Sequence, residues 1–161
     1  MIGERIEGER SRPGRIAARL ARQVELGLAA VDLTLPQYRL LMLLAHQSEG
    51  TSRLADHLAV SRPSITSVVD GLVARGLVVR RPDTGDRRRV EHVLTHEGLE
   101  LLRAADDSVD ARFDEIMSHL DPVDTEGARA GLDCWRRALE SFRAARTGIP
   151  SVDAGAGRAR A

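Results

Sequence analysis

The sequence predicts a mainly α-helical chain with a small β-wing, a winged helix-turn-helix flanked by N- and C-terminal dimerisation helices. Three observations predict this fold class. A short helical segment over residues 51–58 is followed by a turn and by a second helix that begins after Ser61. Two β-branched runs, 77–80 and 90–94, flank a stretch of turn-forming residues. Apolar residues at helical spacing then indicate longer helices on both sides of this module.

The first two helices are predicted by their apolar residues. A helix over residues 14–30 is indicated by apolar side chains four positions apart, namely Ile16, Leu20, Val24 and Leu28. Thr34 is an N-cap residue followed closely by Pro36, and the run after them is apolar on almost every side. We therefore expect a buried second helix that stops near Gly50.

Capping residues mark where the later helices begin and end. Thr51 can cap the short third helix, and Ser61 can cap the fourth, which Gly76 ends in the C′ position. Thr95 can cap a long helix, and Asp121–Pro122 ends that helix and begins the last one.

The last two helices carry apolar stripes that need a partner. The stripe of the long helix is interrupted at Asp106, which either faces solvent or makes a buried contact across a dimer. The last helix has a stripe made of Ala128, Leu132, Trp135, Leu139 and Phe142. Because a single helix-turn-helix binds DNA with low affinity, we expect a homodimer formed by the terminal helices.

Composition and charge narrow the class of protein. With 161 residues, 42% of them hydrophobic, the chain suits a single globular domain, and 2% aromatic residues argue against single-strand binding by base stacking. The net charge is zero, but residues 51–90 hold eight arginines against four aspartates, whereas residues 91–133 hold twelve acids against three arginines. Only one face should therefore attract polyanions.

We expect one domain over residues 14–147, with a flexible N-terminus (1–13) and a disordered tail (148–161). Within that domain the winged helix-turn-helix covers about 36–94, and the dimerisation helices cover about 14–30 and 95–147. The lone cysteine fits a reducing cytosol, the N-terminus is too charged for a secretory signal, and no run is apolar enough to cross a bilayer. We therefore expect a cytoplasmic location and no membrane partner.

Several short motifs, taken in order and spacing, resemble the MarR family (multiple antibiotic resistance regulators) over about residues 15–145. They include Leu33-Thr34-Leu35-Pro36-Gln37, Leu54-Ala55, Val60-Ser61, Val69-Asp70, Gly76-Leu77-Val78 with Arg80, Asp86-Arg87-Arg88 and Leu94-Thr95. The resemblance implies a homodimeric regulator that binds pseudo-palindromic double-stranded DNA, usually as a repressor. In many members a small phenolic or lipophilic ligand releases the DNA, and in a few members oxidation or a metal ion does so.

The helix over residues 61–75 is the expected recognition helix. Its N-terminal turn should lie nearest the bases and supplies four candidate DNA-binding residues, namely Arg62, Ser64, Thr66 and Ser67. Ser61 is more simply a cap. Four further arginines are candidates for phosphate contacts or for pairing with Asp56 and Asp83, namely Arg53, Arg75, Arg80 and Arg81, with Arg80 ranked first.

The wing carries the strongest cationic signal. The resemblance pairs Asp86 with Arg88 and places Arg88 in the minor groove; Arg87 is the alternative, because hairpin register decides which side chain points down. Three adjacent arginines could also form a plain solvated run, but their place on a hairpin tip after a recognition helix favours DNA. The same arginines argue against a winged helix that serves only as a protein-interaction module.

The resemblance also implies a ligand site between the dimer region and the DNA lobe, although core packing alone would account for its lining: Leu20, Val24, Tyr38, Met42 and His46.

Cys134 lies beside Trp135 on an apolar helix, which favours a buried, inert thiol over a redox sensor. No histidine pair has metal-ligand spacing, so we expect no metal and no cofactor; a ligand-independent, cysteine-responsive or metal-responsive regulator is the alternative. An enzyme is disfavoured, because the acids of the long helix lack a nucleophile motif, a glycine loop or a metal frame.

Overall fold

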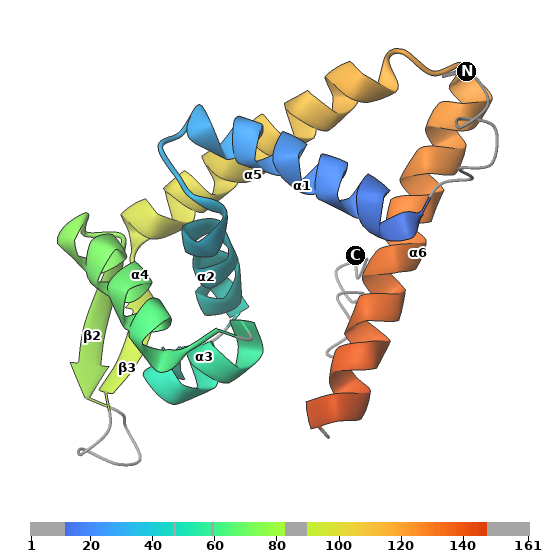
Figure 1. Ribbon diagram of the computed structural model, residues 1–161. Coiled ribbons are helices and arrows are strands. Elements are labelled where there is room, and N and C mark those ends of the chain that lie inside the picture. Colours follow the sequence, from blue (N-terminus) through green and yellow to red (C-terminus); the bar gives the residue numbers. More distant parts are fainter. Residues whose placement is uncertain (1–11, 47, 59, 83–89, 148–161) are drawn as a thin grey trace, which may run out of the picture. The chain divides into compact units, whose positions relative to one another are not determined.

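The structure is a computed structural model that describes residues 12–46, 48–58, 60–82 and 90–147. The expected disordered tail (148–161) and all but Arg12 and Pro13 of the expected flexible N-terminus lie outside these residues. The chain divides into two compact units, residues 1–114 and residues 115–161. Figure 1 shows the first unit as a group of helices with a small sheet at one edge, beside α4.

The first unit begins with α1 (Pro13–Ala29) and α2 (Leu35–His46). The α2 cap is reciprocal: the Gln37 N–H donates to Thr34 Oγ1 at 3.4 Å, and the Thr34 N–H donates to Gln37 Oε1 at 2.9 Å. The cap at Thr34 is therefore confirmed. The helix ends earlier than the expected stop near Gly50, because the chain passes into a short strand, β1 (Glu49–Gly50).

The helix-turn-helix consists of α3 (Thr51–Leu58) and α4 (Arg62–Ala74). Ser61 Oγ accepts the backbone N–H of Ser64 at 3.3 Å, which confirms the predicted cap. Gly76 has φ 74°, in the left-handed region that favours glycine, as expected for its C′ position. These two residues mark the two ends of α4.

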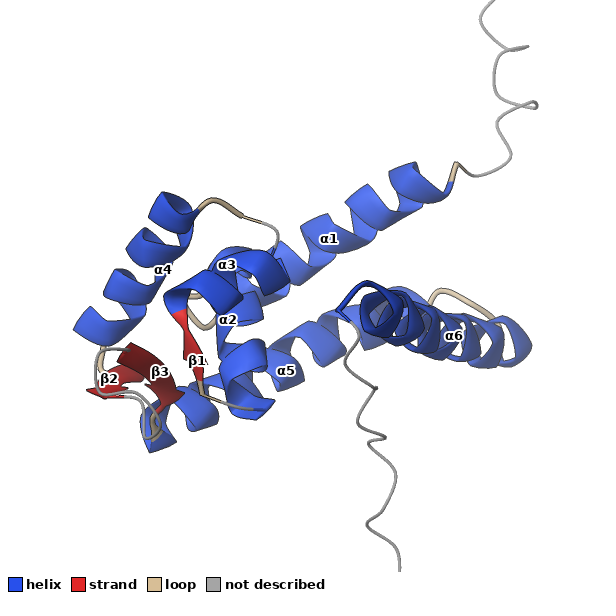
Figure 2. Ribbon diagram, turned by 90° about the horizontal axis from the view of Figure 1, so that it is seen from below, coloured by secondary structure: helices blue, strands red, loops and turns tan. Residues whose placement is uncertain are grey.

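The wing is built on β2 (Val78–Pro82) and β3 (Val90–Leu94), an antiparallel pair in which Arg80 lies opposite His92. The sequence analysis expected only these two strands, with the first at residues 77–80. In the structure β1 also pairs with β3, Gly50 opposite Glu91, and the sheet order is β1-β3-β2 (Figure 2). The third strand satisfies backbone groups along the other edge of β3, which a two-stranded ribbon would leave open.

A single aliphatic core holds the first unit together. Leu28, Leu40, Leu41, Leu54, Ile65 and Leu72 are almost wholly buried, and they come from α1, α2, α3 and α4. The first part of α5 (His96–Met117) joins this core through Leu102, Ala105 and Val109. Helix α4 therefore belongs to a core to which every other helix of the unit contributes.

The start of α5 is tied to the end of α4 by Thr95. Its Oγ1 accepts the Gly98 N–H at 3.0 Å and donates to the Gly76 carbonyl at 2.9 Å. The predicted cap at Thr95 is therefore confirmed, and the same hydroxyl also anchors the entry into the wing. Farther along α5, Ser108 Oγ donates to the Gly27 carbonyl at 2.9 Å, and Arg112 Nε donates to Gln23 Oε1 at 3.0 Å, so α1 and α5 are joined by polar contacts.

The second unit contains the end of α5 and the long helix α6 (Pro122–Thr147). Asp121 Oδ1 accepts the Asp124 N–H at 2.9 Å, which confirms the predicted break at Asp121–Pro122. The apolar stripe of α6 is largely exposed in this single chain, and Trp135 is 62% exposed. The described residues include no helix that is long and apolar enough to cross a membrane.

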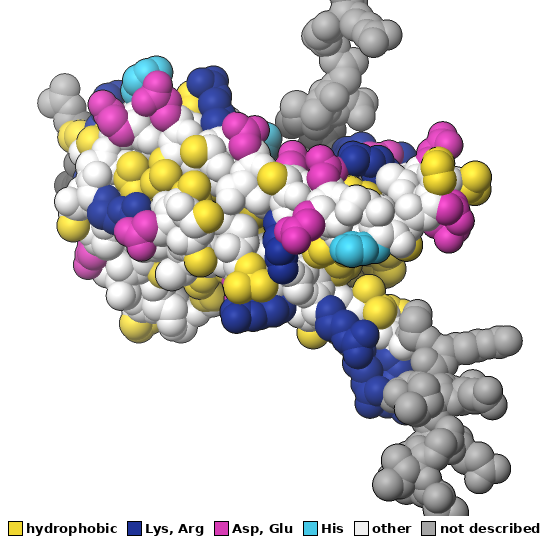
Figure 3. Space-filling view, turned by 90° about the horizontal axis from the view of Figure 1, so that it is seen from above, with side chains coloured by type: hydrophobic (Ala, Val, Ile, Leu, Met, Phe, Trp, Pro, Cys, Tyr) yellow, Lys and Arg dark blue, Asp and Glu magenta, His cyan; other side chains and the backbone are white. Residues whose placement is uncertain are grey.

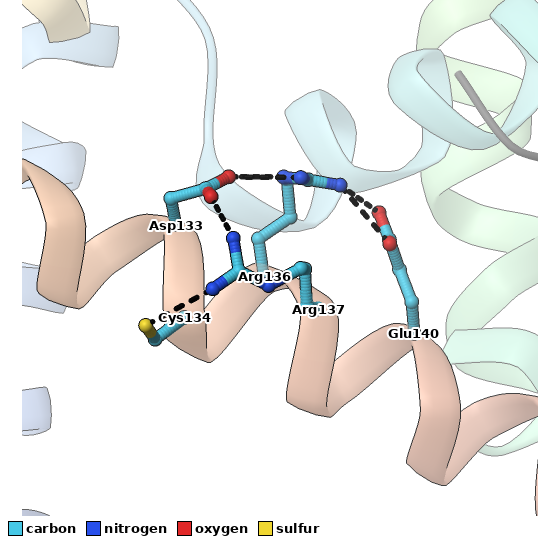
Figure 4. Close-up of polar contacts among 5 residues, drawn as sticks. All are labelled: Asp133, Cys134, Arg136, Arg137 and Glu140. Carbon is cyan, nitrogen blue, oxygen red and sulfur yellow. Dashed lines mark hydrogen bonds and ion pairs between the residues drawn. The ribbon is translucent and has the colours of Figure 1, made fainter. Parts of the chain in front are cut away.

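Cys134 is exposed, so the expectation of a buried thiol is wrong for the single chain. The reason is that it lies, next to the exposed Trp135, on a part of α6 that is open to solvent in the single chain. Its Sγ accepts a hydrogen bond from Arg137 Nη2 at 3.2 Å, while Arg136 and Arg137 both pair with Asp133 (Figure 4). The hydrogen bond from Arg136 lowers the pKa of the Asp133 carboxyl below its usual value.

Candidate nucleic-acid interface

Helix α4 has one buried face and one open face. Ile65, Val69 and Leu72 are buried in the core. The exposed face repeats at three- and four-residue steps and carries Pro63, Thr66, Ser67, Asp70 and Ala74. The buried apolar face fixes the position of α4 against the core. The exposed face of the same helix presents short polar side chains.

The hydroxyl groups near the start of α4 differ in what they can still bind. The Ser61 and Ser64 hydroxyls bond to each other at 2.7 Å, and Thr66 Oγ1 donates to the Arg62 carbonyl at 2.9 Å. Among the described residues Ser67 has no hydrogen-bond partner. Ser67 therefore keeps a free donor for a base or phosphate, whereas Thr66 presents its methyl group and an acceptor.

We expect Ser61→Ala to lower the free energy of unfolding by about 1 kcal/mol, because the α4 N-terminus would lose its side-chain acceptor. Ser67→Ala is the matched control on the same helix, and it should change stability by less than about 0.5 kcal/mol. Urea unfolding followed by circular dichroism measures both changes. Equal losses from the two variants would contradict the cap.

Two of the candidate phosphate-binding arginines are engaged within the protein. Arg80 Nη2 on β2 forms an ion pair with Asp70 Oδ1 on α4. Arg75 Nη1 donates to the Asp32 carbonyl at 2.7 Å, and its Nη2 lies 3.7 Å from Asp32 Oδ2. The acids that pair with Arg80 and Arg75 are therefore Asp70 and Asp32; Asp83, one of the two expected acids, lies outside the described residues. The sequence could not show this, because 43 positions separate Arg75 from Asp32.

The remaining DNA-binding candidates lie on two elements. Arg62 and Ser64 are exposed in the first turn of α4, and Arg53 is exposed on α3. Asp86, Arg87 and Arg88 lie outside the described residues, between the ends of β2 and β3. Strand β2 follows the end of α4, and β3 precedes the start of α5 (Figure 1).

A basic stripe on α1 was not singled out from the sequence. The stripe starts at Arg12, the N-cap residue of α1, and continues at three- and four-residue steps through Arg15, Arg19 and Arg22; all four are exposed. Figure 3 shows dark-blue side chains along this helix next to the grey N-terminal residues. The spacing test that found the apolar side of α1 would also have found this stripe.

The predicted ligand-site residues do not share one environment. Val24 and Tyr38 are half-buried and pack against the core, and Leu20 is half-buried on α1. Met42 and His46 are exposed on α2, and Met42 is 44% exposed. The structure thus brings Val24 and Tyr38 to one core and leaves Met42 and His46 at the surface.

A hydrogen bond from Tyr38 explains why a polar residue, Asp106, interrupts the apolar stripe of α5. Its hydroxyl donates to Asp106 Oδ1 at 2.5 Å, a partly buried contact between α2 and α5 of one chain. Burial, then the Asp106 hydrogen bond, raises the pKa of Tyr38 well above its usual value, so the phenol stays protonated and donates. Asp106 therefore makes an internal contact, which neither sequence alternative described.

These elements define a winged helix-turn-helix, a class of nucleic-acid-binding fold. Residues 33–90 match the model of the MarR family. The transcriptional regulator FarR of Neisseria gonorrhoeae is 38% identical over 92 residues, 55% of this chain and 62% of FarR. The transcriptional repressor NicR of Pseudomonas putida is 38% identical over 78 residues, 47% of this chain and 49% of NicR. The chain thus spans less than two thirds of these relatives.

Solved structures resemble a larger part of the chain. RV1404 of Mycobacterium tuberculosis has a TM-score of 0.69 and 26% identity, over 77% of this chain and 86% of its own. A MepR mutant of S. aureus bound to an oligodeoxyribonucleotide has a TM-score of 0.59 and 25% identity, over 78% and 94%. CouR of Rhodococcus jostii bound to p-coumaroyl-CoA has a TM-score of 0.58 and 29% identity, over 74% and 85%. The chain is therefore similar to MarR-family proteins over residues 33–90, and the relatives named above are transcriptional regulators.

Proposed function

We propose that this protein is a sequence-specific, double-stranded-DNA-binding transcriptional regulator. The observation that carries the proposal is the exposed polar face of α4, with Arg62, Thr66 and Ser67, held on a buried apolar base next to the wing. A helix of this kind fits the major groove, and a wing reaches the neighbouring groove. The family match and the MepR mutant bound to an oligodeoxyribonucleotide support the same function.

The regulator acts as a homodimer in this proposal. The exposed apolar stripe of α6, which includes Leu132, Trp135, Leu139 and Phe142, is a surface that a second copy would cover. Two recognition helices about one helical turn apart, roughly 34 Å, would read an inverted repeat.

Repression and release by a small ligand complete the proposal. NicR is named as a repressor, and CouR was solved with p-coumaroyl-CoA, a phenolic thioester. By analogy, the residues Leu20, Val24, Tyr38, Met42 and His46 would line a site for a phenolic or lipophilic ligand. A titration of the DNA-bound protein with phenolic acids and their thioesters tests this part: loss of DNA affinity supports it, and unchanged affinity throughout favours a ligand-independent regulator.

The test of DNA binding is selection of duplexes from a random library by the purified protein, followed by fluorescence anisotropy over a NaCl series. Recovery of an inverted repeat, with an affinity that falls as salt rises, supports the proposal. If no duplex is enriched and binding to any duplex is absent, the proposal is wrong.

The wing gives a sharper test. Arg88→Ala should weaken operator binding and reduce the slope of log affinity against log salt by about one unit, because one phosphate-region contact is lost. Arg87→Ala is the comparison, since hairpin register decides which of the two arginines enters the groove. An unchanged slope in both variants would show that the wing does not contact DNA.

A further inference from the structure

Asp70 places a carboxylate in the exposed face of α4. It follows Thr66 by four positions and Ser67 by three, so the three side chains share one side of the helix. The only other charged residue between Arg62 and Ala74 is Arg62 itself. An acidic group in the centre of a surface that meets a polyanion opposes binding, unless another group offsets its charge.

The offsetting group comes from a different element. Arg80, on β2, directs Nη2 to Asp70 Oδ1, and the two side chains are 45% and 56% exposed. The strand and the helix lie side by side in the first unit (Figures 1 and 2). In the free protein the guanidinium and the carboxylate therefore form a nearly neutral pair on the exposed face of α4. Both groups are accessible to solvent and could contact DNA.

We propose that Asp70 is a specificity-determining residue that, by engaging Arg80, lowers the affinity of the α4 surface for DNA of any sequence. This inference rests on the proposed DNA-binding function. An arginine that neutralises a phosphate adds affinity without regard to sequence, because the gain comes from released counterions. While Asp70 offsets the charge of Arg80, that gain is reduced, and a larger share of the affinity must come from base contacts.

The pair also explains why an acid is tolerated at this position. Without Arg80, the Asp70 carboxylate would repel the phosphates that flank the groove. The Arg80 guanidinium offsets that repulsion and holds the carboxylate on the side of α4 that faces β2. Arg80 is then a positioning partner of Asp70 as well as the phosphate contact that its place in the sequence suggested. If Arg80 contacts phosphate, removal of the Asp70 carboxylate should tighten DNA binding. If Arg80 only positions Asp70, the same change should not tighten DNA binding.

The experiment compares Asp70→Asn with Asp107→Asn in the full-length chain. Asp107 is an exposed acid on α5, so both variants remove one negative charge and keep the side-chain shape. Anisotropy over a NaCl series measures binding to the selected operator and to a scrambled duplex of the same length. Asp70→Asn should tighten scrambled-duplex binding by roughly threefold to tenfold, steepen its salt slope by about one unit, and lower the operator-to-scrambled affinity ratio. Asp107→Asn should change each affinity less than about twofold.

The variant Asp70→Asn/Arg80→Gln completes the test by returning scrambled-duplex affinity to within about twofold of wild type, because the freed cation is gone. The inference is wrong if Asp70→Asn leaves scrambled-duplex affinity unchanged, or if the two single variants act alike. It is also wrong if Asp70→Asn weakens operator and scrambled binding by the same factor, since the pair would then only support the fold; thermal unfolding checks that case. A wild-type protein that binds no duplex overturns the proposed function itself, a result distinct from any of these.

Discussion

Gly98→Ala is expected to destabilise the first unit by about 3 kcal/mol or more, a large part of the stability of a domain of this size. A Cβ at this position would lie 2.2 Å from the Leu77 carbonyl oxygen and 2.8 Å from Leu94 Cδ1. The Leu77 carbonyl cannot simply move away, because it accepts the Thr95 N–H at 3.1 Å at the junction of wing and α5. Relief of the clash would therefore separate α5 from the wing.

Gly71→Ala is the matched control within the same unit. A Cβ there meets nothing closer than the flexible Gln37 Nε2 at 3.8 Å, and Gly71 lies inside α4. This change should leave the fold intact and raise stability by up to about 1 kcal/mol, because alanine favours the helix. Denaturant unfolding of both variants measures the contrast, and a Gly98→Ala protein as stable as wild type would show that the junction is looser than described.

Trp135→Glu is expected to dissociate the proposed dimer and with it most of the operator affinity. Trp135 is 62% exposed, and Leu139 and Phe142, on the same side of α6, are 61% and 62% exposed. A buried, unpaired carboxylate in the centre of an apolar interface costs several kcal/mol, which is enough to change a dimer equilibrium by more than a hundredfold. Sedimentation equilibrium measures the change in mass, and anisotropy measures the loss of DNA affinity.

Ala130→Glu is the control for this prediction, because it adds the same charge to the opposite side of the same helix, where Ala130 is also exposed. It should leave the molecular mass and the operator affinity close to those of wild type. If the wild-type protein is a monomer at micromolar concentration, or if both variants remain dimers, the α6 stripe is not the dimer surface.

Local signals predicted the boundaries of most elements. Ser61, Gly76, Thr95 and Asp121 act within three or four residues of themselves, so their roles at helix ends could be identified from the sequence and are confirmed by the hydrogen bonds or backbone angle at each position. The resemblance to the MarR family rested on such motifs, and residues 33–90 match the model of that family.

Pairings across the fold were the part that the sequence did not predict. The third strand β1, the Arg75–Asp32 and Arg80–Asp70 pairs, and the Tyr38–Asp106 hydrogen bond each join segments that lie on different elements. Each arginine could pair with any of several acidic residues in the sequence. Only the packing of the helices decides which acid comes within reach. The exposure of Cys134 was misjudged for the same reason, since burial depends on which neighbour covers a helix face.

The amino-acid sequence by itself determined the order of the helices and of the two wing strands and most of the helix ends, because caps, turns and apolar periodicity act over one or two helical turns. Only the tertiary structure decided which charges on α4 and β2 are already paired within the protein, such as Asp70 and Arg80. Side chains far apart in sequence, such as Tyr38 and Asp106, come within hydrogen-bond distance only after the core has set the angles between helices.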